Sequence, residues 1–158
     1  MLLHAHDLLD QKFLESGKFT PAYINGSVHQ AVLEIVKIVS LGVINKEIKI
    51  KCDISRLKSF PVLSFDKRRL QQVLYNLMTN AIKFTRKGLI TISSSLKTRQ
   101  NIDGALILAV SVADQGIGIA AYEVDHVFDG FLETTNSESK ALNPYGNGIG
   151  LQFCKQVC

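Results

Sequence analysis

The sequence predicts an α+β fold, a two-layer sandwich in which helices cover one face of a mixed, mostly antiparallel sheet. Two stretches, 27–41 and 67–84, carry apolar residues at the spacing of an amphipathic helix. Residues 47–54 alternate between apolar and polar side chains, as a half-buried strand does. Two further apolar stretches, 89–97 and 105–114, follow the second helix, so helices and an antiparallel pair of strands are mixed in one chain.

In the first half of the chain, turn and cap residues mark where the predicted elements begin and end. Residues 2–16 place leucine and phenylalanine at roughly helical spacing and stop at Gly17, which predicts a short first helix. The next helix, at 27–41, is followed by a glycine. Residues 61–65 predict a short extended piece, and Asp66 after it is a suitable N-cap for the helix at 67–84.

In the second half of the chain, the strands at 89–97 and 105–114 are separated by a polar stretch that ends in Asp103-Gly104, a pair that favours a hairpin turn. The second strand is apolar on both faces, which predicts a central position in the sheet. Residues 132–147 form a long polar stretch, which predicts a lid over a ligand, with an ordinary surface loop as the alternative. The sequence GIGLQFCKQVC then begins a final helix.

Composition favours one soluble, cytoplasmic domain. The chain has 158 residues, of which 46% are hydrophobic and 20% charged. The net charge is +4, with lysine and arginine spread along the chain, which favours small anionic ligands or general solubility over a nucleic-acid surface. The three cysteines form no C-x-x-C pair, so free thiols are expected. No stretch is long and apolar enough to span a membrane, and a longer parent protein with a membrane anchor remains compatible with this segment.

One face of the helix at 67–84 is unusual in its chemistry. Asn76, Asn80 and Lys83 fall within roughly 60° of one another on a helical wheel, away from the apolar stripe. Asparagine oxygens bind hard cations, and lysine binds phosphate as a point charge. A solvated face of an ordinary amphipathic helix is the alternative for this helix taken alone.

Two glycine clusters bracket the long polar stretch. DQGIGI, residues 114–119, ends a strand, and GNGIG, residues 146–150, begins a helix. Glycine lets a ligand approach the backbone closely, and the first N–H groups of a helix bind phosphate. Neither cluster matches the G-x-x-x-x-G-K-[ST] loop or the G-x-G-x-x-G dinucleotide motif.

The order of these motifs resembles the ATP-binding domain shared by histidine kinases, DNA gyrase B, mismatch-repair ATPases and heat-shock chaperones. The histidine-kinase branch is the most similar: DKRRLQQVLYNLMTNAIKFTRKGLI, VADQGIGI, VFDGF and GNGIGLQFCKQ look like its N, G1, F and G2 boxes. The resemblance implies a Bergerat-type sandwich over 18–158, incomplete at its C-terminus. Residues 1–17 resemble the end of a dimerisation helix.

The resemblance also implies roles for individual residues. Asn80 would bind Mg²⁺ beside Asn76, Lys83 would neutralise phosphate charge, and these three would form the catalytic set. Asp114 would accept a hydrogen bond from the adenine amine. Phe128 and Phe131 would anchor the lid in the core. The remaining residues of the implied ATP site are Gly116, Gly118, Ile119, Gly146, Gly148, Ile149, Gly150 and Leu151.

Position 76 points to the kinase branch. The hydrolytic branches carry a glutamate there as general base for water, and the amide of Asn76 cannot take that proton, so slow ATP hydrolysis is expected. The chain would therefore transfer the γ-phosphate to a histidine in two-component or phosphorelay signalling, with a receiver domain downstream. No phosphoacceptor histidine motif is present, so that histidine would lie on a separate dimerisation domain. The alternatives are a non-catalytic nucleotide sensor or degenerate kinase, and an interaction remnant that no longer binds ATP.

Overall fold

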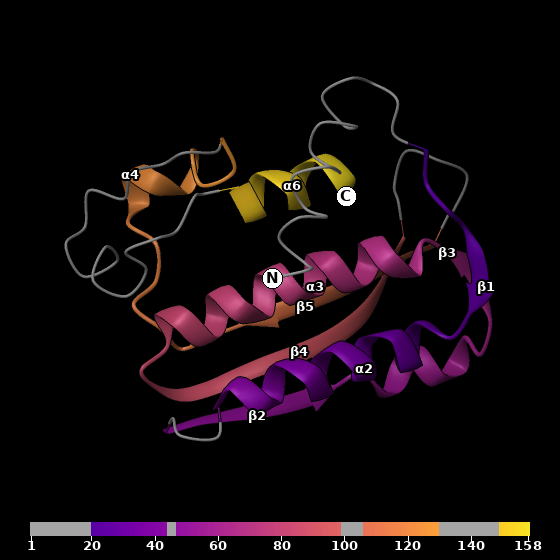
Figure 1. Cartoon of the computed structure of the whole chain (residues 1–158), viewed down its shortest axis with the longest axis horizontal. Coiled ribbons are helices and arrows are strands. Elements are labelled where there is room, and N and C mark those ends of the chain that lie inside the picture. Colours follow the sequence, from indigo (N-terminus) through magenta and orange to yellow (C-terminus); the bar gives the residue numbers. More distant parts are fainter. Residues whose placement is uncertain (1–19, 44–46, 99–105, 130–148) are drawn as a thin grey trace.

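The computed structural model of the chain describes residues 20–43, 47–98, 106–129 and 149–158. Within them, helices and strands form the predicted α+β sandwich, with helices on one face of a mixed sheet (Figure 1). The helix predicted at 2–16, the Asp103-Gly104 turn and the polar stretch at 132–147 lie outside the described residues.

Three strands form the main sheet in the order β2-β4-β5. Strand β2 is Glu47–Asp53, β4 is Lys87–Thr98 and β5 is Leu106–Ala113. The β4–β5 pair is antiparallel, as the sequence predicts, whereas β2 and β4 are parallel. A parallel pair needs a crossover connection, and the segment that contains the helix α3, Lys67–Phe84, supplies it.

The prediction that the strand at 105–114 is central is wrong for the described residues. Among them β5 pairs with β4 alone, and β4 lies in the middle of the sheet. The apolar pattern on both faces of β5 misled the prediction, because its outward residues include Ile107, which is 41% exposed. On the same face of β5 the hydroxyl of Ser111 lies 2.8 Å from that of Ser93 in β4.

A second, smaller antiparallel sheet was not predicted. It pairs β1, Ile24–Gly26, with β3, Leu63–Phe65, which is the short extended piece expected at 61–65. The other short elements are the 3₁₀ helices η1 (Leu41–Val43) and η2 (Ser55–Ser59), the helix α4 (Ala121–Val124) and the final helix α6 (Ile149–Val157).

Both long helices begin at a side-chain cap. Helix α2 is Val28–Ser40, and the Ser27 hydroxyl accepts a hydrogen bond from the backbone N–H of Gln30. In α3 the predicted cap is confirmed, since the Asp66 carboxylate accepts from the N–H of Arg69 at 3.0 Å. These caps explain why each helix begins where the sequence predicts.

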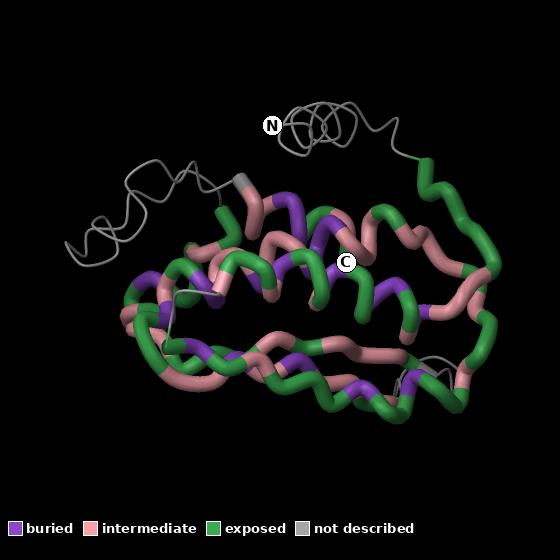
Figure 2. The backbone as a smooth tube through the Cα atoms, turned by 60° about the horizontal axis from the view of Figure 1, so that its bottom comes forward, coloured by how far each residue is buried: buried purple, intermediate pink, exposed green. Residues whose placement is uncertain are grey.

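The core lies between this helix pair and the sheet, as the separate helix and strand layers of Figure 2 show. The apolar stripe of α2 faces inward with that of α3, and both contact the inward residues of β2 and β4. The outer helix α6 packs on the other side of α3, in a small cluster of its own. The fully or nearly fully buried residues of the main core are Val28, Val32, Ile35, Val39, Ile48, Ile54, Leu57, Leu74, Met78, Ala81, Ile82, Ile90 and Ile92.

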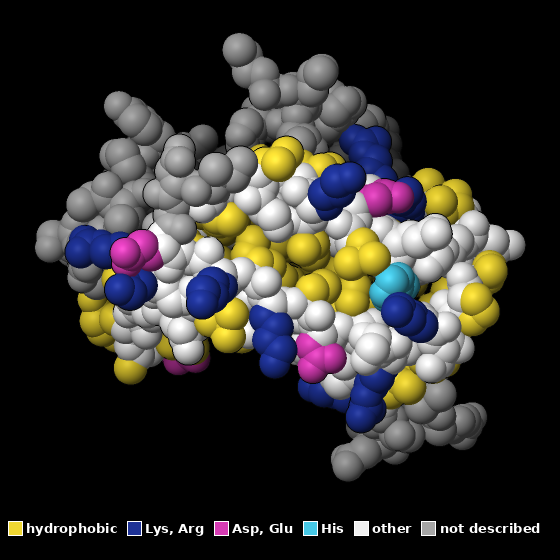
Figure 3. Space-filling model, turned by 90° about the horizontal axis from the view of Figure 1, so that it is seen from below, with side chains coloured by type: hydrophobic (Ala, Val, Ile, Leu, Met, Phe, Trp, Pro, Cys, Tyr) yellow, Lys and Arg dark blue, Asp and Glu magenta, His cyan; other side chains and the backbone are white. Residues whose placement is uncertain are grey.

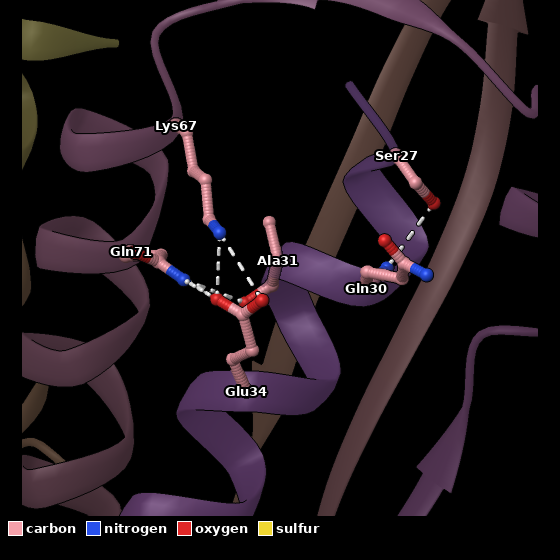
Figure 4. Close-up of polar contacts among 6 residues, drawn as sticks. All are labelled: Ser27, Gln30, Ala31, Glu34, Lys67 and Gln71. Carbon is pink, nitrogen blue, oxygen red and sulfur yellow. Dashed lines mark hydrogen bonds and ion pairs between the residues drawn. The ribbon is translucent and has the colours of Figure 1, made fainter.

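A polar contact joins α2 to α3 at the edge of this core (Figure 4). The Lys67 ammonium lies 2.8 Å from one oxygen of Glu34, and the Gln71 amide donates to the same carboxylate at 2.8 Å. Both contacts hold the pKa of the Glu34 carboxyl below its usual range, with the hydrogen bond from Lys67 the larger cause. The first turns of α3 are therefore held to the middle of α2.

The surface near α2 and β2 has hydrophobic side chains gathered at its centre, with lysines and arginines spread around them (Figure 3). Leu33 and Ile38 of α2 are 41% and 54% exposed. Among the described residues no helix has the length and apolar character needed to cross a membrane.

Candidate functional site

The amide face predicted from the helical period is present on α3. Asn76 and Asn80 are half-buried and lie one turn apart, whereas Leu74, Met78 and Ala81 face the core. Lys83 is exposed near the end of the helix. The Asn80 side chain has no hydrogen-bond partner among the described residues, so its amide oxygen is available to a ligand.

Helix α6 meets this face at its first turn. The Asn76 amide donates a long hydrogen bond, 3.4 Å, to the carbonyl oxygen of Gly150. A Cβ added to Gly150 would lie 3.3 Å from the Asn76 side-chain carbon, tighter than ordinary contact. Glycine at position 150 therefore lets the start of α6 approach the asparagine of α3, and Leu151 is half-buried beside it.

The segment after β5 forms a tight turn around Asp114. The Oδ1 atom of Asp114 accepts a hydrogen bond from the N–H of Gly116 at 2.8 Å, which is the geometry of an Asx turn. Asp114 is exposed, and its second oxygen, Oδ2, has no partner among the described residues. The turn therefore occupies one carboxylate oxygen and leaves the other available.

This turn is held against the C-terminal end of α3. The N–H of Ile117 donates to the carbonyl oxygen of Phe84 at 3.2 Å. Gly116 passes so close that an added Cβ would collide with that same carbonyl group, so only glycine fits there. Phe84 lies one turn beyond Asn80, so the carboxylate segment and the amide face lie at the same end of the molecule (Figure 1).

Gly118, the second glycine of this segment, is required by its backbone conformation. Gly118 has a φ of 71°, in the left-handed region, with no heavy atom within 4 Å of an added Cβ. The next residue, Ile119, is 54% exposed. A side chain at position 118 would thus be disfavoured by backbone conformation and not by crowding.

Not every predicted site residue lies in the part of the chain that the structure describes, and one differs from its prediction. Gly146, Gly148 and Phe131 lie outside the described residues, and for Ile149 only the backbone is described. Phe128 is 39% exposed, so the prediction that it is anchored in the core is wrong. It lies in the turn after α4, a segment that buries only Glu123 among its described residues.

A charged contact lies near this turn and ties it to α6. The Asp129 carboxylate is 3.0 Å from Nδ1 of His126 and 3.6 Å from the ammonium of Lys155. The hydrogen bond to His126 is the largest cause and lowers the pKa of Asp129; desolvation opposes it, and the charge of Lys155 adds to the lowering. The segment before the polar stretch and the helix after it are thereby joined by an ion pair.

The donor atoms suit a magnesium-bound nucleotide better than a protein-held metal cluster. Among the residues that the structure describes, no group of three His, Cys, Asp or Glu side chains lies close enough to hold a metal. Mg²⁺ takes oxygen ligands and is commonly bound by one or two protein groups together with phosphate oxygens. The side-chain oxygen of Asn80, which has no hydrogen-bond partner among the described residues, fits that requirement.

Sequence reasoning missed Gln115, which lies between the aspartate and the first glycine of the motif. Its side-chain oxygen accepts a hydrogen bond from the N–H of Leu89, at the start of β4, at 2.9 Å. Only its place inside the motif singles it out in the sequence, because its partner is 26 residues away.

Comparisons with known proteins show the family to which the chain belongs. The family model described as histidine kinase-, DNA gyrase B-, and HSP90-like ATPase matches residues 65–158, more than half of the chain. Over 152 residues the chain is 31% identical to the sensor protein GacS of Pseudomonas syringae pv. syringae, an alignment that covers 96% of the chain and 16% of GacS. Over 149 residues it is 33% identical to the sensor histidine kinase RcsC of Escherichia coli K12, covering 94% of the chain and 14% of RcsC. The chain therefore spans less than a fifth of these relatives.

Solved structures are similar over most of the chain. Full-length ShkA in complex with AMPPNP matches with a TM-score of 0.75 at 25% identity, covering 99% of this chain and 30% of ShkA. The histidine kinase AdeS of Acinetobacter baumannii matches with a TM-score of 0.69 at 22% identity, covering 97% of this chain and 64% of AdeS. The catalytic domain of the histidine kinase ThkA gives 0.62 at 21% identity, and these last two likenesses concern the fold alone.

Proposed function

Because the chain belongs to the family of histidine kinase-, DNA gyrase B- and HSP90-like ATPases, we propose that it is the ATP-binding catalytic domain of a sensor histidine kinase. The observation that carries the proposal is the meeting of three motif segments. The Ile117–Phe84 hydrogen bond joins the aspartate turn to α3, and the Asn76–Gly150 contact joins α3 to α6. In this proposal residues 1–17 belong to a dimerisation helix and 18–158 to the catalytic domain.

Asn80 and Lys83 hold the phosphate end of the nucleotide. The half-buried Asn80 amide has an oxygen to offer a magnesium ion, and Lys83 lies near it, three positions along α3. Bound Mg²⁺ neutralises phosphate charge as the γ-phosphoryl group is transferred. The first N–H groups of α6, together with Gly146 and Gly148 before it, add hydrogen bonds to phosphate oxygens.

Asp114 recognises the purine base of the nucleotide. Its Oδ1 atom is engaged by Gly116, so Oδ2 accepts from the exocyclic amine of adenine. Guanine carries a carbonyl oxygen at that ring position, which would face the carboxylate as a second acceptor. The carboxylate therefore favours ATP over GTP through both attraction and repulsion.

With Asn76 in this position, water is a poor acceptor for the γ-phosphoryl group. A general base for hydrolysis must take a proton, and a side-chain amide that donates to the Gly150 carbonyl has no such capacity. A neutral histidine of a dimerisation domain needs no such base, because an imidazole nitrogen attacks with its own lone pair. The new N–P bond forms at the γ-phosphorus as the bond to the leaving oxygen of ADP breaks.

The experiment supplies a histidine-bearing dimerisation domain in trans with γ-labelled ATP and Mg²⁺. The proposal expects label on that domain as phosphohistidine, stable to alkali and lost in acid, with little free phosphate. Release of inorganic phosphate at typical enzyme turnover would instead indicate a hydrolytic ATPase. Nucleotide binding without labelled protein would favour a nucleotide-sensing module, and no binding would favour the interaction remnant.

A further inference from the structure

The segment that carries Asp114 is held at three points, each on a different partner. Within the turn, Gly116 donates to Asp114. At the end of α3, Phe84 accepts from Ile117. The third point is the side chain of Gln115, whose oxygen accepts from the N–H of Leu89 at the start of β4. The first two contacts use the motif's own aspartate and its backbone, whereas the third depends on one uncharged side chain.

The register of the sheet explains why this third contact exists. The β4–β5 ladder pairs Ile92 with Val112 and Thr91 with Ala113 and then ends. The two numbers of each pair add to 204, so the same register would bring Leu89 opposite Gln115. The chain turns away at Asp114, so no strand backbone continues the ladder there. The side-chain oxygen of Gln115 accepts the hydrogen bond from the Leu89 N–H in place of a backbone carbonyl of a longer β5.

Gly88 makes room for this side chain. A Cβ at position 88 would lie 2.8 Å from Oε1 of Gln115 and 3.3 Å from its Cβ, and Gly88 has a φ of 130° that side chains rarely adopt. The Gln115 amide therefore rests directly over a glycine in β4. A side chain at position 88 would strain the backbone and push the amide off the Leu89 N–H.

We propose that Gln115 is a positioning residue for purine recognition, an inference that rests on the function proposed above. Its amide fixes the turn between β4 and α3, and the turn fixes the direction in which Oδ2 of Asp114 points. A hydrogen bond to a ligand weakens steeply when its angle is lost, so a looser turn costs affinity for the adenine amine in particular. Gln115 itself does not touch the nucleotide.

A purely structural role makes a different prediction. If Gln115 only caps the end of the sheet, its loss lowers the melting temperature but leaves the preference between nucleotides unchanged. The discriminating readout is the ratio of dissociation constants for ATP and inosine triphosphate, which has a carbonyl in place of the adenine amine. Contacts to sugar and phosphates are common to both ligands and cancel in this ratio.

Three variants of the full chain test the inference by calorimetric titration with Mg²⁺ present. Gln115→Leu keeps the size of the side chain without the acceptor and should reduce the ATP preference about threefold to tenfold. Gly88→Ala disrupts the same hydrogen bond from the β4 side and should change the ratio in the same direction. Gln115→Glu keeps an acceptor oxygen, so it should retain the parent ratio, although its negative charge lowers affinity for both nucleotides. Gln30→Leu, at an exposed glutamine of α2, is the matched control and should leave the ratio unchanged.

The outcomes separate this inference from the proposed function. A parent chain that prefers ATP, with Gln115→Leu and Gly88→Ala keeping the same ratio, overturns the positioning role alone. A parent chain that binds neither nucleotide overturns the proposed function, and the positioning role falls with it. The inference is supported if Gln115→Leu and Gly88→Ala both reduce the preference for ATP over inosine triphosphate while Gln115→Glu keeps the preference of the parent chain.

Discussion

Asn80 is the residue on which magnesium-dependent binding should depend most. Removing its amide in Asn80→Ala takes away the only side-chain oxygen assigned to the ion, so affinity for ATP with Mg²⁺ should fall about tenfold or more. Binding in the presence of EDTA should change much less. Isothermal titration calorimetry with and without Mg²⁺ measures both effects.

Gln71→Ala is a suitable control for Asn80→Ala. Gln71 is also an amide on α3, but it donates to Glu34 and to the Ala31 carbonyl, on the side of α2. Its loss should lower stability modestly and leave nucleotide affinity unchanged. Equal loss of Mg²⁺-dependent binding in both variants would contradict the role given to Asn80.

Asp114→Asn should reduce affinity for adenine nucleotides although the two side chains have nearly the same shape. The Gly116 N–H requires an acceptor, so the asparagine oxygen stays in the turn and its NH₂ group faces the adenine amine, donor against donor. Loss of a hydrogen bond to a charged group predicts a decrease of about tenfold to a hundredfold. Competition of ATP against GTP for a fluorescent nucleotide measures it, and an unchanged ATP preference would place purine recognition elsewhere.

Local periodicity was enough to predict the residues of the α3 face. Asn76 and Asn80 lie one helical turn apart, and that spacing depends on no distant part of the chain. The contact of Asn76 with Gly150 joins residues 74 positions apart, and the sequence around either residue does not predict it. Phe128 was misjudged for a related reason: large aromatic side chains are usually buried, and the packing that decides the matter is not local.

Among the elements, α6 should depend on one aromatic side chain for its attachment to α3. Phe153 is 2% exposed and packs with Val73 and Cys154, while the Arg69 guanidinium lies over its ring at 6.0 Å. Phe153→Ala should cost about 3 kcal/mol or more of unfolding free energy, because it opens a cavity at this contact. Urea denaturation measures the change.

Phe128→Ala provides the matched comparison, since it removes the same side chain from a site that is 39% exposed. It should cost less than about 1 kcal/mol, within the range of ordinary surface substitutions. Equal destabilisation by the two variants would show that α6 is not held through Phe153.

The contact between the α4 turn and α6 should depend on pH. The pKa of Asp129 is lowered, chiefly by its hydrogen bond to His126 and then by the charge of Lys155. A lowered carboxyl pKa contributes stability above the ordinary pKa of aspartate, and that contribution is lost as the pH falls through the lowered value. An NMR titration of the Asp129 carboxyl should show the pKa rise towards its ordinary value in His126→Phe. An unchanged Asp129 pKa in that variant would contradict the hydrogen bond between His126 and Asp129.

At the level of elements, the sequence predicted best what is local. Ser27 and Asp66 are side-chain caps, and together with helical periodicity they fix the starts of α2 and α3. The parallel pairing of β2 with β4 was not predicted, because strand order depends on how α3 crosses the sheet and not on either strand's own pattern. The single-turn helix α4 is too short to leave a periodic signal.

The packing of the whole molecule brings motifs that are distant in the sequence together around α3. Helix α3 lies with one face on the core and its amide face turned away from it, between the turn that leaves β5 and the outer helix α6 (Figure 1). The sandwich buries the apolar stripe of α3, and this burial sets the direction of Asn76 and Asn80. The site is therefore a consequence of one-sided helix packing on a mixed sheet.

The most direct test of this account is a crystal structure of the chain with Mg²⁺ and AMPPNP. The account predicts that the adenine amine lies within hydrogen-bond distance of Oδ2 of Asp114 and that Mg²⁺ is bound to the side-chain oxygen of Asn80. Nucleotide bound at another surface, or a purine in this place with no contact to Asp114, would contradict it.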